Sequence, residues 1–205
     1  MVAPADVVNV ALRLIGGGRI TSLTQDLPQA ATANDIYSNL LDDLLRSHPW
    51  NFATKRVQLS QFATDPAFGF DNAFVLPSDW LRTVSVHPSD STYHNMTYRE
   101  ELVGTTKVIV TSATDCYLRY VARITDVNLW SADFRRAMST ALARDLAVPV
   151  AGSRSLRDDY SKEARRDLNR AKSSDAMGSS PERMPYGSWI TRRGRRLPNV
   201  GTVSE

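Results

Sequence analysis

The sequence predicts an α+β protein that is mainly α: a four-helix bundle with a small antiparallel β-sheet inserted between the second and third helices, and an extended C-terminal arm. Apolar residues recur at helical spacing toward both ends of the chain, whereas the middle contains short β-branched and aromatic runs broken by prolines. At 205 residues the chain can bury one substantial core. The expected parts are two helical pairs at 1–55 and 131–177, the β insert at 56–130, and the arm at 178–205.

Two apolar stripes with clear end signals predict the first helical pair. The first helix is expected over 4–16, because Pro4 suits a first turn and three glycines follow Ile15. The second is expected over 28–47, and Pro49 ends it because the residue before a proline avoids the α region. Their apolar stripes are Val7, Val8, Val10, Ala11, Leu14 and Ile15, then Ala33, Ile36, Tyr37, Leu40, Leu41, Leu44 and Leu45.

The middle of the chain changes to the pattern of short strands. Residues 72–88 are rich in β-branched and aromatic residues, and the runs 106–112 and 116–124 follow. The link Ser-Ala-Thr-Asp between the last two runs predicts a β-hairpin. Strict alternation in the second run puts one set of side chains on one face of the sheet. That set is Cys116, Leu118, Tyr120 and Ala122.

The second helical pair begins at Ser131, a good N-cap with Asp133 in the first turn. Pro149 ends the third helix, and a last helix is expected over 153–176 with a densely charged outer face. The inward residues of the pair are Phe134, Ala137, Met138, Ala141, Leu142 and Leu146, then Leu156, Tyr160, Ala164, Leu168 and Ala171.

Composition excludes several classes of protein. No run of about eighteen apolar residues predicts a membrane span, and the N-terminus has no basic segment followed by an apolar one. The single cysteine, Cys116, cannot form an internal disulfide or a cysteine-based zinc cluster, which fits a reducing compartment.

No motif in the sequence indicates an active site. Gly16–Ile20 follows a helix and lacks the ending of a phosphate-binding loop, so it predicts a turn. His48, His87 and His94 stand at no metal-binding spacing, and Asp42 with Asp43 is explained by a solvated helix face. We therefore expect no catalytic residue, no metal and no cofactor.

Charged residues are distributed unevenly along the chain. Residues 1–130 carry ten Lys/Arg against thirteen Asp/Glu, whereas residues 131–205 carry fifteen against nine. The arm adds aromatic residues to this basic end, which predicts a segment that orders against a partner. DNA binding through this basic tail is the alternative function. We expect the partner to be contacted by these arm residues: Tyr186, Trp189, Arg192, Arg193, Arg195 and Arg196.

The order of these features resembles the head-to-tail adaptors of tailed bacteriophages, the group that includes tail tubular protein A of short-tailed phages. The resemblance covers residues from about 5 to 190. It rests on ALRLIGGGRITSL, LLRSHPWNFATKR, FVLPSDWLRTVSV, YLRYVARITDVNLWSADFRRAMSTALARDLA and YSKEARRDLNRAKSSDA, in this order.

The resemblance implies a structural virion protein without enzymatic activity, located in the tail or neck and assembled in the host cytoplasm. Such adaptors form a ring, usually of twelve copies, below the portal protein. The ring extends the DNA channel, joins the capsid to the next tail protein (a nozzle or tail tube) and takes part in DNA ejection, with possible non-specific DNA contact and no membrane contact.

The resemblance also assigns roles to residues of this chain. The arm would contact the portal or a neighbouring subunit, and Trp50 with Phe52 would fill the seam between bundle and sheet. The segment 87–105 is the expected contact with the downstream tail protein. The candidates for contacts within the ring are Arg135, Arg136, Arg165 and Arg166.

Overall fold

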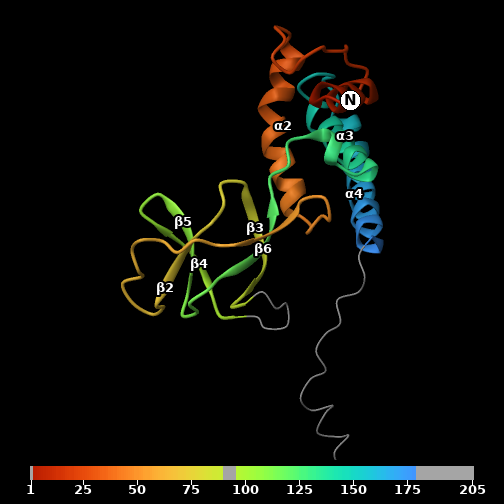
Figure 1. Cartoon of the computed structure of the whole chain (residues 1–205). Helices are drawn as coiled ribbons and strands as arrows, with labels where there is room; N and C mark the ends of the chain where they lie inside the picture. The colour runs from red at the N-terminus through yellow and green to blue at the C-terminus, as the bar shows by residue number, and fades with distance from the viewer. Residues whose placement is uncertain (1, 90–95, 179–205) are drawn as a thin grey trace, which may run out of the picture.

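The computed structural model describes residues 2–89 and 96–178, and these form two halves (Figure 1). One half contains α-helices from both ends of the described chain, and the other contains the strands of the middle segment. Helix α2 (Pro28–Arg46) runs down to the junction between the halves, and strands β3 (Trp80–His87) and β6 (Tyr117–Ala122) lie at its foot (Figure 1). The strand half is therefore an insertion that leaves the helical half after α2 and returns to it before the third helix.

The four predicted helices are confirmed to within a few residues. Ser131 and Ser153 are N-caps, and their hydroxyls accept hydrogen bonds from the backbone N–H of Phe134 and Leu156, both at 3.2 Å. A short 3₁₀ turn, Val127–Leu129, precedes the third α-helix. The helices are α1 Pro4–Leu14, α2 Pro28–Arg46, α3 Ala132–Leu146 and α4 Arg154–Met177.

Helix α3 is the centre of the helical half. It packs against α1, α2 and α4, and nine of its fifteen residues are buried. Two of those are polar, and both are satisfied inside the helical half. The Ser139 hydroxyl donates to the Val7 carbonyl of α1 at 3.1 Å, and the Thr140 hydroxyl donates to the Ala137 carbonyl of α3 at 3.1 Å. Three helices arranged around a fourth replace the predicted bundle.

The strand half corrects the predicted fold more strongly. The class is α+β, but the prediction of a four-helix bundle with one small sheet is wrong, because in the described ranges six strands form two three-stranded antiparallel sheets. The strand orders are β1-β6-β3 and β2-β5-β4. The strands are β1 Thr54–Gln58, β2 Asn72–Val75, β3 Trp80–His87, β4 Arg99–Val103, β5 Thr106–Thr111 and β6 Tyr117–Ala122.

The predicted hairpin between 106–112 and 116–124 does not form. Each of these runs supplies the central strand of a different sheet, so each already has a partner on both sides. The prediction also missed β1 and β4 as strands. Both are edge strands with mostly exposed residues, so they lack the apolar alternation from which strands are recognised.

One hydrophobic core connects the halves. Phe74 and Ile109 of the second sheet belong to the same buried cluster as Leu118 of the first sheet and Met138 of α3. A smaller cluster of Ala73, Val108 and Val110 lies on the other face of the second sheet. The two halves therefore share one continuous core.

Aromatic rings close the insertion where the chain leaves and re-enters the helical half. Trp50, which follows α2, and Trp130, which precedes α3, both meet the Phe134 ring edge-on, with ring centroids 4.9 and 5.1 Å apart. Phe52 contacts the same ring at 5.0 Å. The indole N–H of Trp50 donates to the Leu44 carbonyl at 3.0 Å, and that of Trp130 donates to the Ile124 carbonyl at 3.0 Å.

We expect Phe134→Ala to lower the free energy of unfolding by about 3–5 kcal/mol, because it removes a fully buried ring and leaves a cavity among three others. Denaturant titration followed by tryptophan fluorescence measures this. Phe68→Ala is the matched control: its ring is 90% exposed, and the expected change is within about 0.5 kcal/mol. Equal effects of the two substitutions would contradict the central place of Phe134.

Candidate functional site

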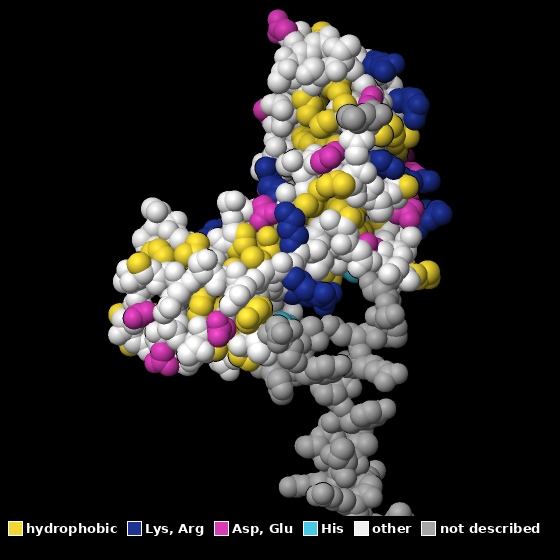
Figure 2. Space-filling view, viewed as in Figure 1, with side chains coloured by type: hydrophobic (Ala, Val, Ile, Leu, Met, Phe, Trp, Pro, Cys, Tyr) yellow, Lys and Arg dark blue, Asp and Glu magenta, His cyan; other side chains and the backbone are white. Residues whose placement is uncertain are grey.

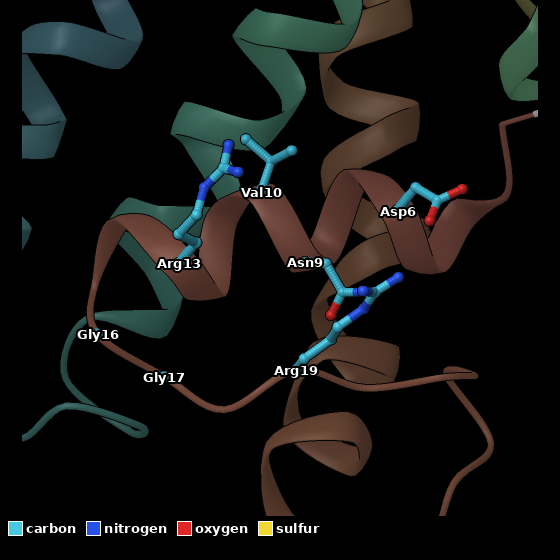
Figure 3. Close-up of a pocket in the computed structure, with 7 residues that line it drawn as sticks. All are labelled: Asp6, Asn9, Val10, Arg13, Gly16, Gly17 and Arg19. Atoms are coloured by element: carbon cyan, nitrogen blue, oxygen red, sulfur yellow. The ribbon is translucent and has the colours of Figure 1, made fainter.

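The turn after α1 borders a hollow of about 680 Å³ (Figure 3). Gly16 has φ +77°, a left-handed conformation that favours glycine, and it ends the helix as predicted. The Asn9 side chain fixes the following segment, since its amide donates to the Ile20 carbonyl and its oxygen accepts from the Ile20 N–H, both at 2.8 Å. The lining residues are Asp6, Asn9, Val10, Arg13, Gly16, Gly17 and Arg19.

The charged side chains around this hollow do not converge. Arg13 extends beside Val10, whereas Arg19 lies on the Asn9 side of the helix (Figure 3). The Asp6 carboxylate accepts a hydrogen bond from the Ala3 N–H at 2.9 Å, within its own helix end. The two arginines that line the hollow therefore lie apart from one another (Figure 3).

The described histidines have local partners. His48 Nε2 lies 3.3 Å from an Asp175 carboxylate oxygen, and its ring meets Trp50 edge-on at 4.9 Å. His87 Nε2 lies 2.9 Å from the Ser85 hydroxyl. His94 falls outside the described residues. Over 2–89 and 96–178, no three His, Cys, Asp or Glu side chains are grouped so that they could hold a metal ion.

Two other side chains that could take part in chemistry, Cys116 and Asp42, have structural surroundings. Cys116 is fully buried, and burial raises the pKa of its thiol to about 12, so the thiol stays protonated at neutral pH. Asp42 is not simply solvated: its carboxylate accepts from Arg123 Nε at 2.6 Å and joins α2 to the segment after β6.

A groove of about 540 Å³ lies between α2, α3 and α4. Its floor is apolar, with Leu40, Leu44, Ala141 and Ala164 all buried. Its rim is basic and contains Arg144, which forms a bidentate pair with Asp145 at 2.7 Å for both bonds. The rim also contains two exposed arginines, Arg157 and Arg165.

A smaller hollow of about 230 Å³ lies on the other side of α4, against α1 and α3. The exposed parts of Val10 and Leu14 contribute apolar surface there. Arg136 at its edge binds within the chain, with Nε 3.1 Å from Asp167 and Nη2 3.7 Å from Glu163. The hydrogen bond to Asp167 is the main cause that raises the Arg136 pKa.

The predicted ring residues therefore differ in their surroundings. Arg165 and Arg166 are exposed on α4, Arg135 is half-buried on α3, and Arg136 is exposed but already paired. Basic side chains line the α3–α4 side of the helical half, and a second group lies where the two halves meet (Figure 2). In the described ranges, no helix is both long and apolar enough to span a membrane.

The predicted arm residues, 186–196, lie outside the described chain, but the point at which the arm begins is held firmly. Near the end of α4, Asp175 accepts the Asn51 N–H with both carboxylate oxygens at 3.1 Å. The Asn51 side-chain amide donates to the Asp175 carbonyl at 2.6 Å. These contacts join the end of α4 to the connection that follows α2.

A second tie joins the strands of the first sheet. The Asp79 carboxylate binds Lys55 of β1 at 2.6 Å and accepts from the Tyr120 hydroxyl of β6 at 2.9 Å. Burial acts to raise the pKa of Asp79, but the hydrogen bonds from Lys55 and Tyr120 outweigh it, so the pKa is below its ordinary value. Burial, together with Asp79, raises the Tyr120 pKa to about 12.

The sequence did not reveal the groove or the two ties around Asp79 and Asp175. Each depends on residues from segments that are far apart in the chain, such as Lys55 with Asp79 and Asn51 with Asp175. Helix periodicity could only indicate that Leu40, Leu44 and Ala164 point inward. Neither a scan against protein-family models nor a search of curated protein sequences found a match to this chain.

We expect Asp79→Asn to lower the free energy of unfolding at pH 7 by about 1 kcal/mol or less, as for partly exposed ion pairs. Because the folded pKa of Asp79 is lowered, its stabilisation is present above the unfolded pKa of about 4 and is lost as pH falls through the folded pKa. The gap between wild type and variant should therefore close in acid.

Denaturant titrations at pH 7 and at acid pH measure this gap. Asp35→Asn is the matched control, the same change at an exposed position of α2. A gap that stays constant or widens in acid would show that the Asp79 charge does not stabilise the sheet.

Proposed function

We propose that this protein is a structural virion component, a head-to-tail adaptor that assembles as a ring below a portal protein. The proposal rests first on the resemblance in the order of sequence motifs. The structural observation that supports it best is α4, which has only three buried residues among its twenty-four: Ala164, Asp167 and Ala171. A long helix with so little burial in its own chain suits a subunit whose neighbours cover it.

The two hollows beside α4 support side-by-side packing. A closed ring of identical subunits uses heterologous contacts, in which two different surfaces of each subunit meet. The groove between α2, α3 and α4 offers an apolar floor and exposed Arg157 and Arg165. Residues 1–130 are net acidic, so another copy can bring a complementary surface to this basic rim.

The tie between Asn51 and Asp175 supports a role for the arm that follows α4. An arm that reaches from the adaptor ring to the portal ring has to begin at a defined position. The tie between Asn51 and Asp175 supplies that position, because it holds the end of α4 against the junction of the two halves. The aromatic and basic residues of the arm are then the anchors that we propose for portal contact.

We expect the full chain to co-sediment with its cognate portal ring and a chain ending at Gly178 to fail, because the truncation removes the proposed anchors. Sedimentation of the mixed components, analysed by gel, measures this. The truncated chain should unfold at the same temperature as the full chain, because the helical and strand cores lie within the residues that it retains. Absence of the full chain from the portal fraction would overturn the adaptor role.

We also expect Arg165→Glu to weaken ring formation on the portal by about tenfold or more, because a carboxylate on the groove rim would repel the acidic surface of the neighbouring copy. Arg170→Glu is the matched control: it makes the same charge change on an exposed position of α4 that does not line the groove. Ring occupancy counted by electron microscopy distinguishes the two. Equal losses would remove the groove from the proposed contact.

A further inference from the structure

The loop between β1 and β2 presents an exposed aromatic ring at its tip. Phe68 is 90% exposed, the largest value among the large apolar side chains that the structure describes. Gly69 follows it with φ +88°, a left-handed conformation that favours glycine and turns the chain there. This segment, residues 63–71, is called the Phe68 loop below. In Figure 1 it lies beside β2, on the side of the strand half that faces away from the helices.

The base of this loop is fixed to the second sheet. Phe62 and Phe70, near its two ends, both pack against the smaller buried cluster of that sheet. The Phe62 N–H donates to the Ala73 carbonyl at 2.7 Å. The Gln61 side-chain amide donates to Asn72 Oδ1 at 2.8 Å. A loop whose ends are held together in this way loses little conformational entropy when its tip binds a partner.

The Phe68 loop carries only negative charge. Asp65 and Asp71 are both exposed, and residues 63–71 contain no Lys, Arg or His. The next most exposed large apolar residue of the strand half is Leu102, but its hairpin also contains Arg99 and Lys107. An acidic loop with an aromatic tip is complementary to a surface that is apolar at its centre and basic around it.

The groove between α2, α3 and α4 has an apolar centre of suitable size. Two of its four buried floor residues, Ala141 and Ala164, have side chains of a single methyl group, which leaves open space above them. The volume of about 540 Å³ lies within the range of about 300–1,000 Å³ in which proteins hold small ligands. One phenyl ring therefore fits in the groove.

The rim of the groove has the opposite charge to the loop. Arg144 and Asp145 pair with one another, so together they add no net charge. Arg157 and Arg165 are exposed, and neither makes an ion pair with another residue of the described ranges. The rim therefore has a net charge of two positive groups, and the loop has two negative ones. The arginine-rich arm of the chain lacks this complementarity to a basic rim.

We propose that the Phe68 loop of one copy of this chain binds in the groove between α2, α3 and α4 of the next copy. The Phe68 ring covers the apolar floor, and the two loop carboxylates approach the two rim arginines. Loop and groove are different surfaces of one chain, so the contact is heterologous and can repeat from copy to copy. The inference rests on the proposed function, which brings copies side by side, and it names the segment that fills the groove.

Sedimentation velocity of the full chain over a concentration series measures this self-association. We expect Phe68→Ala to weaken it by at least about tenfold, because the variant removes the aromatic anchor from an apolar groove. The variant should still fold, since the ring is exposed in the single chain. Leu102→Ala is the matched control, a truncation at a 64% exposed residue of the same half, and it should leave the association unchanged.

Mixing two variants tests whether loop and groove bind one another. Phe68→Ala retains an intact groove, and Arg157→Glu with Arg165→Glu retains an intact loop. Each variant alone should stay monomeric at concentrations at which the wild-type chain associates. The mixture should form a dimer with one copy of each and nothing larger, because one intact loop and one intact groove remain. A mixture that stays monomeric would overturn the inference.

Reversal of the charges gives a second, independent test. Asp65→Lys with Asp71→Lys should weaken association, because it brings positive groups to a basic rim. Adding Arg157→Glu with Arg165→Glu to the same chain should restore association, because opposite charges then face one another again. If the combined variant stays as weak as the loop variant, the rim does not receive the loop.

Two further results would also overturn the inference: a wild-type chain that is monomeric throughout the series, and equal losses for Phe68→Ala and Leu102→Ala. None of these measurements contains the portal protein. A chain that joins the portal ring but fails these tests would leave the adaptor role standing. A chain that associates through its loop but does not join the portal ring would overturn the adaptor role alone.

Discussion

The packing of two tryptophans on Phe134 is the contact on which the rest of the architecture depends. The chain passes between the two halves twice, once near Trp50 and once near Trp130. Both tryptophan rings contact the buried ring of Phe134. The indole N–H groups are satisfied by the Leu44 and Ile124 carbonyls, so both rings are buried with their polar groups paired. An insertion closed at its base in this way has a defined direction relative to the helices.

That closure determines where the surfaces of the molecule lie. Because β1 begins just after Trp50 and β6 ends just before the return to α3, the first and last strands of the insertion are neighbours in one sheet. The same sheet adjoins the end of α2 through Arg82. Helix α3, at the centre of the helical half, leaves α4 on the outside with a groove on each side. The proposed contact with a neighbouring subunit consequently lies along α4 and the grooves beside it.

Prediction from the sequence worked where burial has a strong local pattern. Helices over 28–47 and 153–176 could be recognised because their apolar residues recur at helical spacing and prolines or serines stand at their ends. The strands β1 and β4 could not, because edge strands that expose most of their residues do not need apolar alternation. The same limit applied to the candidate ring contacts. The sequence showed that four arginines lie on helices, but it did not show which of them are exposed and which are paired within the chain: Arg135, Arg136, Arg165 and Arg166.

By itself the sequence determined the α+β class, the four helices and the Ser131 cap of the third helix, because these depend on local periodicity and residue chemistry. Only the tertiary structure decided which strands pair. The runs ending at Thr111 and beginning at Tyr117 are adjacent in the chain, but each becomes the centre of its own sheet, because both are buried strands that need two partners. The placement of Arg56 of β1 opposite Arg119 of β6 follows from that pairing, since a strand's register is set by its partners across the sheet.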